Sequence, residues 1–131
     1  MRILIAEDDY ASRKFLSKFL SAYGECDITI DGLEALEAFM LGWDEGKPYD
    51  LICLDIMMPE LDGVKTLKTI RDIENQKGVE ESKRVKIIMT TALNDTESVY
   101  NAFDIGCEAY AAKPIDTKKL VEVMRKLDLI K

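Results

Sequence analysis

Two kinds of segment alternate along the chain, short apolar runs and longer stretches of mixed polarity. The apolar runs have the length of buried strands and lie at residues 3–6, 27–30, 51–54, 85–89 and 107–112. Between them, apolar residues recur at helical spacing over about 10–22, 33–43, 64–74, 95–106 and 116–127. Five strands alternating with five helices predict an α/β fold with a parallel sheet, because right-handed crossovers place helices on both faces.

The helical spacing also predicts which side chains face the core. In the first two helices these are Phe15, Leu16, Phe19 and Leu20, followed by Leu33, Leu36, Phe39 and Met40. The later helices present Val64, Leu67, Ile70 and Ile73, and then Leu120, Val123, Met124 and Leu127. We find no linker, repeat or low-complexity segment, and expect one domain over residues 1–131 with no output domain.

Composition narrows the class of protein. At 47% apolar and 33% charged residues the chain has the make-up of a globular domain. The net charge of −7 argues against non-specific nucleic-acid binding, which depends on lysine and arginine. No apolar run approaches the ~20 residues that span a bilayer, and the N-terminal segment is no signal peptide. We therefore expect a cytoplasmic protein without membrane insertion.

Cysteine and histidine usage removes several kinds of site. Cys26, Cys53 and Cys107 have no paired spacing and each lies in or beside a predicted strand, which indicates reduced thiols in the core. The chain has no histidine. Catalytic triads that need histidine and the usual zinc sites are thereby excluded.

Polar residues stand where the predicted strands end. The first strand leads into Glu7, Asp8 and Asp9, and the third ends on Asp55. The fourth ends at Thr90 and Thr91, and the fifth at Lys113 before Pro114. Because the carboxyl ends of parallel strands form one edge, where open α/β sheets bind ligands, we expect these groups to meet.

The chemistry of this set points to phosphate. Clustered carboxylates repel one another unless a cation is present, and an oxygen-rich cluster suits Mg²⁺. A hydroxyl and an ammonium beside the acids supply what a phosphoryl group needs, and an aspartate can accept that group. Four of the polar residues are interpreted instead as helix caps or surface groups, namely Asp9, Asp62, Thr90 and Asp116. Asn94 or Asp95 is expected to cap the fourth helix.

Four motifs in order along the chain resemble the receiver domain of two-component response regulators, in the form of the chemotaxis response regulator. They are ILIAEDDYASR, LDIMMPELDG, IIMTTA and AYAAKPI, and the resemblance covers nearly the whole chain. It implies a doubly wound, flavodoxin-like sheet of strand order 2-1-3-4-5. It also implies a switch in a two-component or phosphorelay system that takes phosphate from a histidine kinase or phosphotransfer protein and acts on an unknown downstream protein.

The resemblance assigns roles to individual residues. Asp55 is the implied phosphoacceptor, with Thr91 and Lys113 contacting the phosphoryl group. Glu7, Asp8, Asp55 and the backbone carbonyl of Met57 are the implied Mg²⁺ ligands, and Asp9 is an extra acid. Thr91 and Tyr110 are the implied switch, whose rearrangement changes the surface formed by the fourth helix, fifth strand and fifth helix. The domain would have no enzymatic activity beyond self-phosphorylation and self-dephosphorylation.

Some positions depart from the family pattern or add to it. Glu7 stands where the family often has aspartate, so we expect it to reach the ion through water, and the connection Asn75–Arg84 is longer than usual. Met57 and Leu93 are apolar neighbours of the site and predict a long-lived phosphoryl group. Val99 and Phe103, one turn apart, form either an exposed partner patch or part of the core.

Other function classes fit the sequence less well. A Mg²⁺ phosphohydrolase with an aspartyl nucleophile would have a second aspartate two residues on, where this chain has Met57. A flavodoxin-like cofactor binder would have a phosphate loop rich in glycine, serine and threonine after the first strand, but here that loop is acidic. A degenerate receiver would lack one of the implied site residues, and each of those positions is filled.

Overall fold

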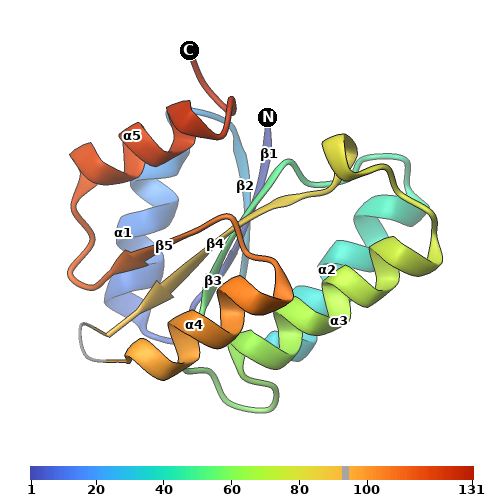
Figure 1. Cartoon of the computed structure of the whole chain (residues 1–131). Coiled ribbons are helices and arrows are strands. Elements are labelled where there is room, and N and C mark those ends of the chain that lie inside the picture. Colours follow the sequence, from blue (N-terminus) through green and yellow to red (C-terminus); the bar gives the residue numbers. More distant parts are fainter. Residues whose placement is uncertain (93–94) are drawn as a thin grey trace.

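The computed structural model describes residues 1–92 and 95–131. Its parallel strands form one five-stranded sheet in the order β2-β1-β3-β4-β5, with helices on both faces (Figure 1). The strands are β1 (Arg2–Ala6), β2 (Glu25–Thr29), β3 (Leu51–Asp55), β4 (Lys86–Thr91) and β5 (Ala109–Ala112). The doubly wound fold and the expected strand order are therefore confirmed.

The helices follow the strands in strict alternation. They are α1 (Tyr10–Leu20), α2 (Gly32–Asp44), α3 (Gly63–Gln76), α4 (Thr96–Ile105) and α5 (Thr117–Lys126). Within the long connection anticipated from the sequence, α3 continues to Gln76 and a 3-10 turn, η1, spans Glu81–Lys83. Within the described residues, no helix combines the length and the apolar character that crossing a bilayer takes.

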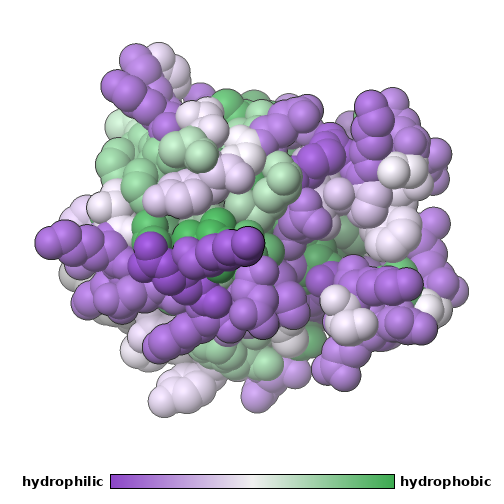
Figure 2. Space-filling model, turned by 90° about the horizontal axis from the view of Figure 1, so that it is seen from above, coloured by the Kyte–Doolittle hydropathy of each residue, from purple (hydrophilic) through white to green (hydrophobic). Residues whose placement is uncertain are grey.

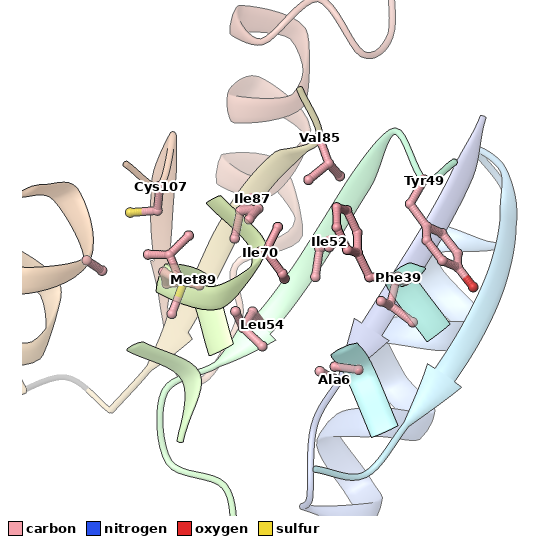
Figure 3. Close-up of a cluster of buried hydrophobic side chains, with 14 of the residues drawn as sticks. Ala6, Phe39, Tyr49, Ile52, Leu54, Ile70, Val85, Ile87, Met89 and Cys107 are labelled. Carbon is pink, nitrogen blue, oxygen red and sulfur yellow. The ribbon is translucent and has the colours of Figure 1, made fainter. Parts of the chain in front are cut away.

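Two hydrophobic layers hold the helices on the sheet. Leu51 and Cys53 of β3 pack on the layer with α1 and α5, whereas Ile52 and Leu54 pack on the layer with α2, α3 and α4. This split follows from the alternation of side chains along a strand. Figure 3 shows the second layer as a continuous row from Cys107 to Tyr49.

Sheet order decides which strand is most enclosed. All five residues of β3 are buried, because the strand is central and covered on both faces.

Seen from the end that carries both termini, the surface is mainly hydrophilic, with apolar atoms gathered on the side of α5 (Figure 2). The carboxyl ends of the strands lie at the opposite edge, at the bottom of Figure 1.

The apolar faces of the first two helices are narrower than their spacing predicted. Leu16, Leu20 and Phe39 are buried as expected, but Phe15 is 44% exposed, and Leu33 and Met40 are 47% and 42% exposed. A helix lying on a sheet buries one stripe, and in α2 this stripe is Ala35, Phe39 and Gly42. The apolar residues beside the stripe therefore face solvent.

Candidate functional site

Three strand ends bring the charged residues together. Glu7 directly follows β1, Asp55 is the last residue of β3, and Lys113 directly follows β5. Because β4 lies between β3 and β5, the Lys113 side chain has to cross β4 to reach the acids. The Lys113–Pro114 peptide bond is cis.

Lys113 binds both buried acids. Its Nζ donates to Glu7 Oε1 at 2.9 Å and to Asp55 Oδ2 at 3.2 Å. Glu7 is fully buried and Asp55 is 3% exposed. Two carboxylates this close and this deep repel one another, and the shared ammonium is what offsets that repulsion.

The pKa values reflect this balance. Burial, followed by the hydrogen bond and the charge of Glu7, raises the pKa of Asp55 to about 7, against the opposing effect of Lys113. Burial tends to lower the pKa of Lys113, but its hydrogen bonds and charge interactions with Glu7 and Asp55 outweigh burial and raise it. The site thus holds a firmly protonated lysine and an aspartate that gives up its proton near neutral pH.

Glu7, Asp8 and Asp55 form a group suited to a cation. Each offers a carboxylate oxygen, and these oxygens lie within 4.8 Å of one another. Glu7 Oε2 is buried and accepts no hydrogen bond from the described residues, although Lys113 Nζ lies 2.9 Å away. A buried oxygen with spare capacity in an all-carboxylate set fits a hard cation such as Mg²⁺.

The β1–α1 loop is fixed by side chains on both sides of the acids. Asp9 caps α1 by accepting from the Ser12 N–H, as expected for the extra acid. Arg13 donates to the backbone carbonyls of Glu7 and Asp8 at 3.0 and 3.2 Å. This role of Arg13 does not follow from the sequence alone, since an arginine on a helix is ordinarily a solvated residue.

The loop after β3 is equally constrained. Asp62 caps α3 through the Lys65 N–H, and Asp116 caps α5, so both interpretations as caps are confirmed. A Cβ at Gly63 would lie 2.2 Å from the Asp55 carbonyl oxygen, which explains why glycine stands there. Met57 donates its N–H to Asp55 Oδ1 at 3.3 Å while its side chain is 68% exposed.

Thr91 and Tyr110 lie beside the charged cluster rather than in it. The Thr91 hydroxyl is buried and donates to the Ala92 carbonyl at 3.2 Å. Tyr110 is 49% exposed, and its ring meets Phe103 edge to face at a centroid distance of 6.0 Å. A cavity of about 220 Å³ is lined by Thr91, Tyr110, Val99 and Phe103, among others. The expected hydroxyl and aromatic residues therefore share one cavity.

Several sequence interpretations need correction. Thr90 is neither a cap nor a surface group, because it lies within β4 and is 2% exposed. Asp95 precedes α4, but its side chain makes no capping hydrogen bond within the part of the chain that the structure describes. Leu93, expected to shield the site, and Asn94, the other expected cap, lie outside the described residues.

The cysteines and the α4 residues have clear outcomes. Cys26, Cys53 and Cys107 are free thiols as expected, the last two buried. Burial raises the pKa of Cys53 to about 12 and that of Cys107 to about 11, so neither is a reactive thiolate.

Phe103 is 44% exposed, which favours the surface interpretation of this residue over the core one.

Comparison with known proteins agrees with this geometry. Residues 3–125 match the family described as response regulator receiver domain. The chain is 33% identical over 126 residues to the hybrid signal transduction histidine kinase L of Dictyostelium discoideum, covering 95% of this chain and 7% of that protein. It is 29% identical over 123 residues to the chemotaxis protein CheY of Treponema pallidum, covering 92% and 78%.

Solved structures give the same picture. The chain resembles the CheX-CheY-BeF3-Mg²⁺ complex from Borrelia burgdorferi, with a TM-score of 0.82, 25% identity and coverage of 100% of this chain and 90% of that one. It also resembles the complex of Saccharomyces cerevisiae Ypd1 with the receiver domain of Ssk1, with a TM-score of 0.80, 29% identity and coverage of 95% and 86%. The chain spans only 7% and 52% of the first two curated relatives it matches.

Proposed function

The chain belongs to the response regulator receiver domain family, and from that premise we propose that Asp55 accepts the phosphoryl group that a receiver domain takes up. The observation that carries the assignment is Lys113, whose ammonium binds the buried carboxylates of Asp55 and Glu7 at once. Asp55 ends the central strand and combines burial with a polar surrounding. It ends β3, the strand next to β4, whereas Glu7 and Asp8 follow β1, one strand farther from Lys113.

The reaction transfers a phosphoryl group from a donor molecule to the carboxylate of Asp55. A carboxylate oxygen of Asp55 attacks the phosphorus and forms an O–P bond, while the bond from phosphorus to the donor atom breaks and the donor keeps that electron pair. The ammonium of Lys113 contacts the phosphoryl group and offsets the negative charge on the phosphoryl oxygens. The reaction requires Asp55 to be ionised, and its pKa of about 7 permits this at neutral pH.

We propose that Glu7, Asp8, Asp55 and the Met57 carbonyl hold Mg²⁺ in this reaction, Glu7 through water. Carboxylate oxygens of the three acids lie within 4.8 Å of one another, and Glu7 Oε2 has capacity for a further partner. When bound, the ion neutralises negative charge that would otherwise oppose the approach of phosphate. The domain's own activity is then limited to taking phosphate from small donors and losing it to water.

In this proposal, Thr91 and Tyr110 transmit the phosphorylation of Asp55 to the protein surface. A phosphoryl group on Asp55 draws the Thr91 hydroxyl away from the Ala92 carbonyl, its present acceptor. Tyr110 then turns from its exposed position into the shared cavity, which changes the surface of α4, β5 and α5. This is a shift between two conformations, because the phosphoryl group makes different contacts in each of them.

A histidine kinase or a histidine phosphotransfer protein is the proposed donor. The relationship to a hybrid histidine kinase and the resemblance to a receiver domain bound to Ypd1 support this class of partner. The downstream partner is proposed to be a protein that binds the α4–β5–α5 surface, where Phe103 and Tyr110 present exposed rings. Val99 lines the same cavity as these two residues.

A direct test uses acetyl phosphate with Mg²⁺, and beryllofluoride as a stable mimic of the phosphoryl group. The protein should gain the mass of one phosphoryl group, and the gain should be lost in Asp55→Asn. NMR signals of Tyr110 should shift with beryllofluoride in the wild type but not in that variant. A mass gain that survives Asp55→Asn would overturn the assignment.

A further inference from the structure

The hydroxyl of Thr90 has no role in the proposed function. Its Oγ1 is buried and has no hydrogen-bond partner among the described residues. A buried hydroxyl without a partner costs free energy, and such groups in a folded protein call for an explanation. Thr90 is 2% exposed, so it is not a solvated surface group.

The sheet register places Thr90 next to the reacting carboxylate. Its Cα is paired with that of Asp55 on one side and with that of Ala111 on the other. Side chains alternate along a strand, and Ile88, two residues before Thr90, packs with α1 and α5. The same alternation from Cys53 puts Asp55 on that face. Thr90 and Asp55 are therefore lateral neighbours on one face of the sheet.

The Lys113 side chain passes over the same place. Lys113 lies two residues beyond Ala111, so alternation directs it to the face of Thr90. It reaches Asp55 on β3 and Glu7 after β1, and β4 separates β5 from both. The register places Thr90 in β4 at the level of Asp55, the carboxylate that this side chain reaches.

The ammonium has a donor to spare. It carries three N–H groups, and hydrogen bonds to Glu7 and Asp55 use two of them. We propose that Thr90 is a positioning residue for Lys113. Its hydroxyl accepts an ammonium N–H when Lys113 turns from Glu7 toward a phosphoryl group on Asp55, which holds the ammonium over β4. The inference rests on the proposed function, because it concerns the phosphorylated site.

Two substitutions separate the hydroxyl from the shape of the side chain. Thr90→Val keeps the shape and removes the acceptor, and Thr90→Ser keeps the acceptor and removes a methyl group. Thr90→Val should slow phosphorylation by acetyl phosphate about threefold to tenfold, the factor that one hydrogen bond is worth, whereas Thr90→Ser should stay closer to the wild type. Asp55 should still gain one phosphoryl group in both variants.

A second measurement observes Lys113 itself. With Mg²⁺ and beryllofluoride, NMR of the wild type should show the Lys113 ammonium protons close to the Thr90 methyl group. Their exchange with water should be faster in Thr90→Val and unchanged in Thr90→Ser. A purely structural role of Thr90 would not move this signal.

The outcomes distinguish this inference from the proposed function. If Thr90→Val is phosphorylated at the wild-type rate, or the ammonium protons lie away from Thr90 in the beryllofluoride complex, the positioning role is wrong and the phosphoacceptor assignment stands. If the wild type gains no phosphoryl group on Asp55, the proposed function itself fails.

Discussion

Lys113 Nζ lies 3.2 Å from Asp55 Oδ2, although one strand, β4, lies between their strands: Lys113 follows β5 and Asp55 ends β3. This contact joins the edge of the sheet to its centre. It also makes the protonation of one residue depend on the presence of the other.

The stability of the unliganded protein should depend on Asp55 and on pH. The pKa of this carboxyl rises from 3.8 to about 7 on folding, so its contribution to stability is fully present below pH 4 and is lost as the pH rises through 7. The free energy of unfolding of wild type relative to Asp55→Asn should therefore fall across this window. Denaturant titrations of both proteins at a series of pH values measure the difference, and a difference that does not change with pH would contradict the prediction.

Removing the ammonium should expose the repulsion between the two acids. Lys113→Met should cost about 3–5 kcal/mol of stability at pH 8, the range for breaking a buried pair. The loss should be smaller at pH 5, where Asp55 takes up a proton. The double variant Lys113→Met with Asp55→Asn is the control and should recover much of the loss in chemical unfolding experiments. Equal losses in the single and double variants would show that packing, not charge, is responsible.

The sequence was sufficient for the fold and for the charged site because both follow from simple periodicity. Strands that end on Glu7, Asp55 and Lys113 must deliver these residues to one edge of a parallel sheet. The burial of Thr90 does not follow from the sequence, since two adjacent threonines in β4 leave open which of them is paired with Asp55. That choice depends on register, which only the paired strands reveal.

Arg71 illustrates a different limit of sequence reasoning. It is 6% exposed and donates to Glu74, to Glu108 and to the backbone carbonyls of Val85 and Gly106. Helical spacing gives its position on α3 but not its partners, which lie up to 37 residues away in the chain. Such a network is visible only once α3, β4 and the start of β5 are brought together.

Arg71 should accordingly matter for stability far more than a surface lysine of the same helix. Arg71→Met leaves Glu74 buried without its cation and should cost about 3–5 kcal/mol. The matched control is Lys68→Met, which breaks the exposed pair with Asp72 and should cost less than about 1 kcal/mol. Equilibrium unfolding of both variants measures the contrast, and similar losses would refute a special role for the buried network.

Met57 should lengthen the lifetime of the phosphoryl group. Its side chain is 68% exposed two residues after Asp55, where it offers an attacking water no hydrogen bond. Met57→Asn supplies a polar group at this place and should speed the loss of phosphate about twofold to tenfold, the effect of one added hydrogen bond. The decay of the phosphorylated mass after removal of acetyl phosphate gives the rate. Met57→Leu is the control and should decay as the wild type does; an unchanged rate in Met57→Asn would count against the shielding role.

The contact between Phe103 and Tyr110 should favour the unphosphorylated conformation. The two rings meet at 88°, and an aromatic pair of this kind is worth about 0.5–1.5 kcal/mol. If Tyr110 turns into the cavity on phosphorylation, it must give up this contact. Phe103→Ala should then shift the equilibrium about twofold to tenfold toward the inward position without any phosphate.

NMR of the Tyr110 ring in the unphosphorylated protein measures that shift. In Phe103→Ala the Tyr110 signals should move part of the way toward those of the beryllofluoride-bound wild type. Tyr100→Ala is the matched control, because it truncates another aromatic residue of α4 that is 73% exposed. A movement of the same size in both variants would mean that α4 responds to any truncation, and that the ring contact does not hold Tyr110 outward.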